Sequence, residues 1–473
     1  MRLLLVPLDN RPCNYRFPVM LAEIGDIDLL VPPCELLGDF NKTANAEVIA
    51  KWVSGEFPRC SGAIISLDTL CFGGLVPSRE SPKDPDETFN MVTSFLSGMK
   101  NSGDGFIWAF DSIMRTLPTT GKSLDNIIPN VSRFYSNREF FPSGKTRKYL
   151  ENYLQLRNLK HRVDRKFMDL VAGGELDYIA YGLDDTGKKC PGHDEAKCLY
   201  EYGTGLKIVD KIYLSCGIDE MAMLLVARAG AKFHRYSPGI FFKFYPEEAG
   251  DSNPLYEDRA LKEIAFAQVN LAGGANTNEK NADITILVHG TTNQVEASSQ
   301  VPGRAPEEII KALDSAFSMG KKVALADLKY ANGADMSLIE GLADLAPVSR
   351  LYSYAGWNTA ANSLGTVIAH SILRFLSTGG EKCEIFHQAF LLERLLDDGL
   401  YQGNLRREAR EKFHDPEFAE PWIRQELSSR AENIFKKYFP GSPYKIQNLH
   451  VSLPWRRFFE VDIKVTLGPI GVL

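Results

Sequence analysis

The sequence has no long hydrophobic run. No apolar segment approaches the roughly 20 residues that a membrane-spanning helix needs. The apolar stretch near the N-terminus, Leu3–Val6, ends at Pro7 and is soon followed by Asp9. It is too short for the hydrophobic part of a signal peptide, and no small-residue cleavage site follows it. We therefore expect a cytoplasmic protein that does not bind membranes.

Positive charge is not in excess either, because 54 Lys and Arg residues stand against 60 Asp and Glu residues and give a net charge of −6. Nucleic-acid-binding proteins normally carry a basic stripe, so no nucleic-acid partner is expected. The eight cysteines are scattered along the chain, which favours reduced thiols. The spacing of Cys190, His193 and Cys198 fits no common structural zinc site. We assign no metal site and expect no cofactor.

Several catalytic signatures are missing. The sequence contains no GxSxG, no HExxH, no Walker loop, and no GxGxxG after a strand. These absences argue against serine hydrolases of the GxSxG type, zinc proteases, P-loop NTPases and dinucleotide-binding enzymes.

What the chain does contain is a recurring pattern in which a short apolar strand runs directly into a carboxylate. The pattern occurs at Asp9, Asp68, Asp111, Asp184–Asp185, Asp219–Glu220 and Asp327. Short, wholly apolar runs are typical of buried parallel strands. In α/β folds the carboxyl ends of such strands meet at the face where ligands bind. The pattern predicts an enzyme, most simply a hydrolase, with an acidic site at the strand ends.

Strand and helix patterns alternate, which predicts an α/β fold with parallel sheets. Strands are expected near residues 2–8, 27–32, 62–67, 105–110, 177–182, 211–215, 232–236, 283–288, 322–327 and 350–354. Residues 1–245 are predicted to form a barrel-like or Rossmann-like module with the acidic site. Residues 280–375 are predicted to form a smaller Rossmann-like module, and residues 376–473 a helical tail with a terminal strand. The polar segment 246–282 is expected to be a linker.

Asp184 and Asp185 are the first catalytic candidates. Two adjacent carboxylates at a strand end can supply a proton donor and an ionised partner, as glycoside hydrolysis requires. Asp185 can instead cap the following turn. Asp219 and Glu220 open a helix, where they can act as a base or a ligand, or simply satisfy the free N–H groups of the first turn.

The substrate-binding candidates combine acids, amides, arginines and aromatic rings. Gly73 and Gly74 let a ligand approach the backbone closely, and Arg79 can hold a carboxylate, a phosphate or a sugar hydroxyl. Trp357 can stack on a sugar ring. Structural roles stay open for most of these residues. The full set is Asp9, Asn10, Arg11, Asp68, Gly73, Gly74, Arg79, Arg115, Tyr354, Trp357 and Asn358.

Long motifs along the chain resemble those of one known family. The segments VPLDNRPCNYRFP, SLDTLCFGGLVPSR, IMR, GLDDTG, GIDE, KYANGAD, YAGWNTAANSLG and LPWRRFFEVD are similar, in this order, to the bacterial family called domain of unknown function 4127. The resemblance covers nearly the whole chain. It implies no established activity and assigns no catalytic residue.

Three functions stay open on the sequence alone. The first is a glycosidase-like hydrolase of a carbohydrate or similar polyhydroxylated substrate. Asp184 and Asp185 would supply acid and base or substrate-orienting roles, and Trp357 and Asn358 would close over the ligand. The second is a metal-dependent hydrolase or transferase that uses the same acids as ligands. The third is a non-catalytic protein that binds a sugar or another metabolite. The sequence does not predict an oligomeric state.

Overall fold

The protein is an α/β protein made of two compact units, which confirms the predicted fold class. The computed structural model describes residues 1–40, 42–80, 84–115, 144–187, 190–301, 303–343 and 347–471. The first unit comprises Met1–Tyr15, Asp28–Ala222 and Tyr256–Arg259, and the second comprises Arg16–Ile27, Met223–Leu255 and Ala260–Leu473. Each unit is therefore assembled from segments that lie far apart in the sequence.

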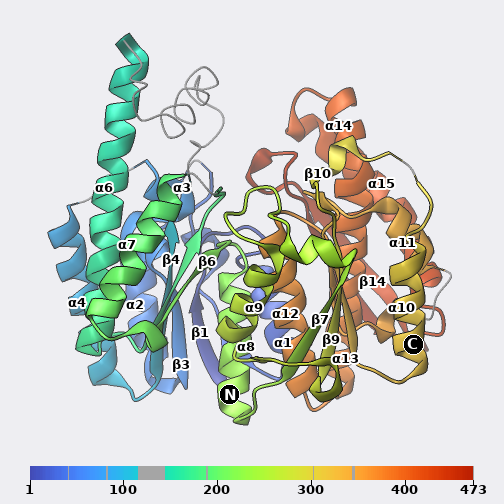
Figure 1. Cartoon of the computed structure of the whole chain (residues 1–473), viewed down its shortest axis with the longest axis horizontal. Helices are drawn as coiled ribbons and strands as arrows, with labels where there is room; N and C mark the ends of the chain where they lie inside the picture. The colour runs from blue at the N-terminus through green and yellow to red at the C-terminus, as the bar shows by residue number, and fades with distance from the viewer. Residues whose placement is uncertain are drawn as a thin grey trace. The chain divides into compact units, whose positions relative to one another are not determined.

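The first unit is built on a six-stranded parallel sheet with the strand order β2–β1–β3–β4–β5–β6 (Figure 1). Strands β3 and β5 are buried along their whole length, as strands of parallel sheets usually are. The strand order reverses at β1, and open α/β sheets bind ligands at the carboxyl ends beside such a point. The strands are β1 (Arg2–Val6), β2 (Asp28–Leu30), β3 (Gly62–Ser66), β4 (Phe106–Ile113), β5 (Tyr178–Leu183) and β6 (Ile212–Cys216).

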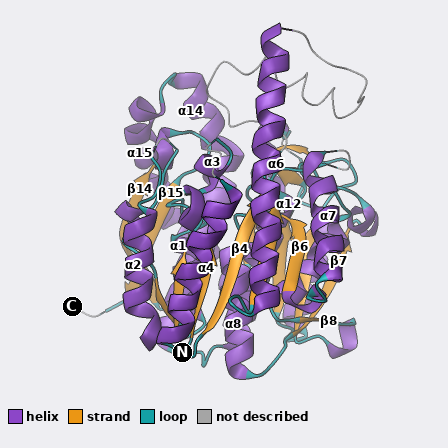
Figure 2. Ribbon diagram, turned by 90° about the vertical axis from the view of Figure 1, so that its left-hand side faces the viewer, coloured by secondary structure: helices purple, strands orange, loops and turns teal. Residues whose placement is uncertain are grey.

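Four helices cover one face of this sheet, and Figure 2 shows them in front of its strands. Their apolar sides pack on the strands, with Ile49, Val92, Phe167 and Leu199 in the shared core. The four are α2 (Ala46–Glu56), α4 (Pro85–Ser102), α6 (Gly144–Gly173) and α7 (Pro191–Gly205). The shorter elements are η1 (Cys34–Leu36), η2 (Phe57–Arg59), the π-helical η3 (Asp68–Phe72), α3 (Leu75–Ser78) and η4 (Val209–Lys211).

The second unit contains a five-stranded parallel sheet with the order β13–β11–β9–β7–β8. Read from β8, the strands of this sheet are the second, first, third, fourth and fifth of the sheet in chain order. The first sheet begins with the same order when it is read from β2. The strands are β7 (Gly239–Tyr245), β8 (Ala275–Asn276), β9 (Ile284–His289), β11 (Val323–Asp327) and β13 (Tyr354–Ala355). A separate two-stranded pairing joins β10 (Val295–Glu296) to β12 (Tyr330–Ala331).

Helices make up much of the rest of the second unit, as predicted for the C-terminal region. Helix α12 (Ala360–Leu376) is buried along nearly its whole length. The other α- and π-helices are α1 (Arg16–Ile24), α8 (Met221–His234), α9 (Leu261–Leu271), α10 (Glu307–Ser318), α11 (Met336–Leu342), α13 (Glu381–Arg394), the π-helical η9 (Leu395–Leu405), α14 (Arg406–Lys412) and α15 (Pro416–Tyr438). The boundary between the two units lies within α8. The chain closes with an antiparallel pair, β14 (Tyr444–Ser452) and β15 (Asp462–Pro469).

Three details differ from the expectations drawn from the sequence. The parallel strands form two open sheets, so the barrel-like alternative for the first module is wrong. The strand expected at 232–236 is wrong as well, because helix α8 continues to His234 and the strand begins only at Gly239. The segment expected to be a linker contains α9, whose Gln268 donates to the carbonyl of Ala361 in α12 at 2.9 Å.

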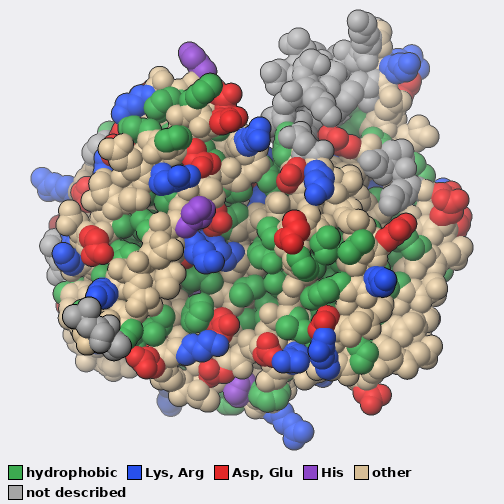
Figure 3. Space-filling model, turned by 180° about the vertical axis from the view of Figure 1, so that it is seen from behind, with side chains coloured by type: hydrophobic (Ala, Val, Ile, Leu, Met, Phe, Trp, Pro, Cys, Tyr) green, Lys and Arg blue, Asp and Glu red, His purple; other side chains and the backbone are tan. Residues whose placement is uncertain are grey.

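In the part of the chain that the structure describes, no helix is both long enough and apolar enough to cross a membrane. On the face drawn in Figure 3, basic and acidic side chains are interspersed.

Candidate functional site

Arg11 joins two strand-end carboxylates of the first unit. Its guanidinium donates to Asp9, with Nη2 2.8 Å from Oδ2, and to Asp219, with Nη2 2.6 Å from Oδ1 and Nη1 3.1 Å from Oδ2. Asn14 donates to Oδ1 of both acids, at 3.0 and 3.2 Å. All four residues are buried. The strand-end pattern therefore brings together residues 208 positions apart.

Local turn chemistry holds this group in place. The carboxylate of Asp9 accepts the backbone N–H of Arg11 at 3.0 Å, the short-range bond that Asp favours in turns. The hydroxyl of Thr69 donates to the carbonyls of Pro7 and Leu8 at 2.6 and 2.8 Å, which ties the turn after β1 to the turn after β3.

Asp184 and Asp185 each pair with a different arginine. Asp184 forms a buried ion pair with Arg79. Asp185 lies 3.0 Å from Nη1 of Arg115, and its side chain is 34% exposed, against 9% for Asp184. Asp185 also adopts a left-handed backbone conformation with φ of 40°, which turns the chain directly after β5.

The environments of Asp185 and Asp219 shift their proton affinities in opposite directions. Burial and the neighbouring charge of Asp184 raise the pKa of Asp185. Burial also acts against ionisation of Asp219, but the charge and hydrogen bonds of Arg11 outweigh it and lower the pKa of Asp219. The charge of Asp219 is close enough to contribute to the raised pKa of Asp185. One edge of the sheet thus holds a carboxyl whose pKa is raised beside one whose pKa is lowered.

Two glycines permit the close approach of the β5 and β6 strand ends. A Cβ atom on Gly182 would collide with the carbonyl oxygen of Gly217. Gly217 itself has φ of 86°, and a Cβ atom there would collide with the carboxylate of Glu220. Glu220 is fully buried, so it packs beneath this turn.

Asp68 belongs to a different cluster. Lys160 of α6 extends its Nζ to Asp111 at 2.6 Å, to Asp164 at 2.8 Å and to Asp68 at 3.5 Å, and all four side chains are buried. The three carboxylates raise the pKa of Lys160 although burial opposes it, and burial together with the charge of Asp68 raises that of Asp111. The sequence analysis missed Lys160 and Asp164. Their i, i+4 spacing on the buried side of a long helix was the available signal.

The remaining first-unit candidates lie in the loops of this edge. Gly73 and Gly74 have φ of 90° and 127°. Their backbones bond to other loop atoms, since Gly73 accepts from the N–H of Ala44 at 2.9 Å and Gly74 donates to the carbonyl of Asp68 at 3.1 Å. The backbone N–H of Asn10 lies 3.4 Å from the carbonyl of Gly38.

Tyr354, Trp357 and Asn358 belong to the second unit. The hydroxyl of Tyr354 lies 3.4 Å from Oδ2 of Asp327. Trp357 is 4% exposed and packs against Phe459, with ring centroids 5.7 Å apart. Asn358 has φ of 70° and accepts the backbone N–H of a second left-handed residue, Asn332, at 2.9 Å.

These residues adjoin a buried polar cluster at the carboxyl ends of β9 and β11. His289 and Asp327 are paired in the β9–β11 register. His289 Nε2 lies 2.9 Å from Asp335, which also pairs with Lys329 at 2.8 Å. Despite burial, these partners lower the pKa of Asp335 to about 2. Burial raises the pKa of Asp327 to about 6 and that of Asp398 to about 7.

The sequence comparisons identify a family. The chain matches the family described as "Protein of unknown function (DUF4127)" over residues 3–128 and 143–464. The chain belongs to this family. No curated protein and no solved structure matches it. Every carboxylate and arginine of the first-unit edge lies within the DUF4127 match, but the family description assigns no activity to any of them.

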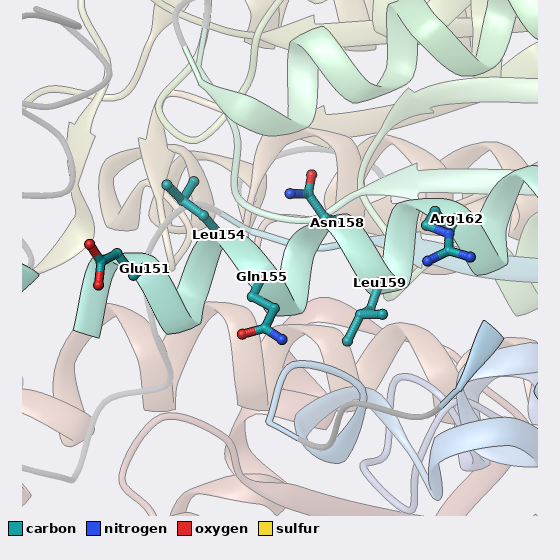
Figure 4. A pocket seen from close by; sticks show the side chains of 6 residues that line it. All are labelled: Glu151, Leu154, Gln155, Asn158, Leu159 and Arg162. Atoms are coloured by element: carbon teal, nitrogen blue, oxygen red, sulfur yellow. The ribbon is translucent and has the colours of Figure 1, made fainter. Parts of the chain in front are cut away.

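A surface hollow of about 460 Å³ in this DUF4127 protein lies along α6 (Figure 4). It is lined by Glu151, Leu154, Gln155, Asn158, Leu159 and Arg162, none of which was predicted as a site residue. Among the described residues, no group of three or more His, Cys, Asp and Glu side chains is arranged to hold a metal ion. Cys190, considered above beside His193, instead accepts the backbone N–H of His193 at the start of α7.

Proposed function

We propose that the carboxyl edge of the first sheet is the active site of a hydrolase that acts on a carbohydrate or a similar polyhydroxylated substrate. The observation that carries the proposal is the opposite shift in pKa at Asp185 and Asp219. Carboxyl groups whose environments separate their pKa values are the usual division into a proton donor and an ionised partner. Asp185 is the proton donor, and Asp219 stays ionised and stabilises positive charge that develops on the substrate.

Asp184 has a supporting role in this proposal. The carboxylate of Asp184 is held in a buried ion pair with Arg79. Its charge helps to keep the proton on Asp185. Asp184 is therefore a positioning residue in this proposal and Asp185 alone is the acid, whereas the sequence left acid, base and substrate-orienting roles open for both residues.

A polyhydroxylated substrate suits the other groups at this edge. The carboxylates of Asp9, Asp184, Asp185 and Asp219 accept hydrogen bonds, and the guanidinium groups of Arg11, Arg79 and Arg115 donate them. The four acids and three arginines nearly balance in charge, which favours a neutral substrate. Sugar hydroxyls both donate and accept, so they match such a mixed surface.

The test is a screen of chromogenic glycosides followed by substitution at the proton donor. Asp185→Asn keeps the shape of the side chain and removes the proton. With an alkyl glycoside of the sugar found in the screen, whose leaving alcohol is weakly acidic, kcat should fall by about 10²- to 10⁴-fold, the usual contribution of general acid catalysis. Asp210→Asn, at an exposed position in η4, is the matched control and should retain full activity. Full turnover of the alkyl glycoside by Asp185→Asn would contradict the proposal.

A further inference from the structure

A histidine–carboxylate pair lies in the first unit outside the residues assigned above. His193 stands in the first turn of α7, and its Nδ1 lies 2.7 Å from Oδ2 of Asp258. The imidazole is 44% exposed, whereas the side chain of Asp258 is fully buried. The buried member of the pair thus holds a ring that is open to solvent.

Asp258 is itself firmly held. Arg259 donates from Nε to Oδ1 at 2.7 Å, and the thiol of Cys216 donates to the same oxygen at 2.9 Å. Burial opposes ionisation, but the bonds from Arg259, Cys216 and His193 lower the pKa of Asp258 to about 2. The carboxylate is therefore ionised at neutral pH and accepts a hydrogen bond from Nδ1 of His193. Nε2 then carries the free lone pair.

The pair lies at the same sheet edge as Asp185. Cys216 is the last residue of β6. Thr186, which follows Asp185, donates its backbone N–H to the carbonyl of Tyr256 at 2.8 Å, two residues before Asp258. On the other side of the pair, a Cβ atom on Gly192 would lie 3.5 Å from Cγ2 of Thr186. Both residues of the pair are thus anchored next to the loop that carries Asp185.

We propose that His193 is a further proton-transferring residue of this edge and that Asp258 is its positioning residue. The identity of the substrate rests on the proposed function. In hydrolysis, Nε2 of His193 takes a proton from water while the water oxygen bonds to the substrate carbon. The bond from that carbon to the leaving oxygen breaks, and Asp185 gives its proton to the leaving oxygen. Proton exchange with solvent then restores both groups.

The reactivity of His193 can be tested without a known substrate. Diethyl pyrocarbonate acylates unprotonated imidazole, and peptide mapping by mass spectrometry gives the rate at each histidine. His234, His414 and His450 are matched controls, because they are exposed and form no ion pair with a carboxylate among the described residues. His193 should react faster than each control, because the Asp258 carboxylate holds Nδ1 as the donor and leaves Nε2 as the attacking nitrogen, and Asp258→Asn should abolish the difference.

Equal or slower reaction of His193 would overturn the proposal. Because Asp258 is buried, circular dichroism and thermal unfolding must first confirm that Asp258→Asn folds.

His193→Gln leaves the buried bonds of Asp258 to Arg259 and Cys216 in place and provides a second test. With a glycoside that the protein hydrolyses, His193→Gln should lower kcat by about 10²-fold and remove the acid limb of the pH profile. If Asp185→Asn is inactive but His193→Gln keeps both its rate and its pH profile, the role of His193 is wrong and the proposed function stands.

Discussion

At the scale of the residue, the candidate site is made of ion pairs from which water is largely excluded. Arg11 is 5% exposed and is the shared partner of Asp9 and Asp219. Breaking a buried pair costs far more than breaking an exposed one, because the remaining charge has lost both its solvation and its partner. The stability of this edge therefore depends on the same residues as its proposed chemistry.

Arg11→Ala should destabilise the protein strongly, since it leaves two buried carboxylates without their counter-charge. The expected loss in the free energy of unfolding is about 3–5 kcal/mol, measured by urea denaturation. Arg2→Ala is the control, because the Arg2–Asp28 pair is exposed to solvent and its loss should change the stability far less. Similar losses in the two variants would show that the Arg11 pairs contribute little.

Asp327 should make the stability depend on pH. Burial raises its folded pKa to about 6 from an ordinary value of 3.8, so the folded state binds this proton more tightly than the unfolded chain does. The resulting stabilisation is present at low pH and is lost as pH rises through about 6. Each pKa unit corresponds to about 1.4 kcal/mol, so the change is about 3 kcal/mol.

Asp327→Asn cannot ionise. Its stability relative to wild type should therefore improve by about 2.4 kcal/mol between about pH 4 and pH 8, since part of the change already occurs below pH 4. Denaturation curves at both values measure this difference. Asp314→Asn, at an exposed position in α10, controls for general effects of pH. If the stability of Asp327→Asn relative to wild type does not change with pH, the pKa of Asp327 is not raised in the folded protein.

At the scale of the element, the approach of the β5 and β6 strand ends depends on the absence of side chains. Gly182→Ala should destabilise the protein by about 1–3 kcal/mol, the usual cost of overpacking, because its Cβ would meet the carbonyl of Gly217. Gly98→Ala is the control, since this helical position in α4 faces open space. That substitution should stabilise the protein by about 0.5–1 kcal/mol. A neutral Gly182→Ala would mean that the strand ends tolerate wider spacing.

The sequence predicted where strands and helices lie better than it predicted which strands pair with one another. Apolar runs and helical periods are local signals, so most strands and the alternating α/β pattern could be predicted. The assignment of β7 to the second sheet depends on pairing with β9, which lies far along the chain and has no local signature. The expected strand at 232–236 failed because the apolar residues there continue helix α8.

The candidate site was predictable to a similar extent. The strand-end rule grouped Asp9, Asp184 and Asp219, because the position of a residue after a parallel strand fixes where it lies. It could not pair Asp184 with Arg79, or His193 with Asp258, since those contacts join separate loops. The pair with Asp258 exists only because residues 256–259 return to the first unit.

At the scale of the whole molecule, the chain repeats one arrangement of parallel strands in two units. In each unit, titratable side chains gather at the carboxyl ends of the sheet, where open α/β sheets bind ligands. In the first unit, the pKa of Asp185 is raised and that of Asp219 is lowered. The proposed function depends on the role of Asp185 as the proton donor.

The most direct test of Asp185 as the proton donor compares the loss of kcat/KM caused by Asp185→Asn between substrates with different leaving groups. A proton donor is needed most when the departing alcohol is weakly acidic. With an alkyl glycoside of a sugar that the wild type hydrolyses, the variant should lose about 10²- to 10⁴-fold in kcat/KM, whereas with the dinitrophenyl glycoside of the same sugar the loss should largely disappear. An equal loss with both leaving groups would contradict the assignment of Asp185 as the proton donor.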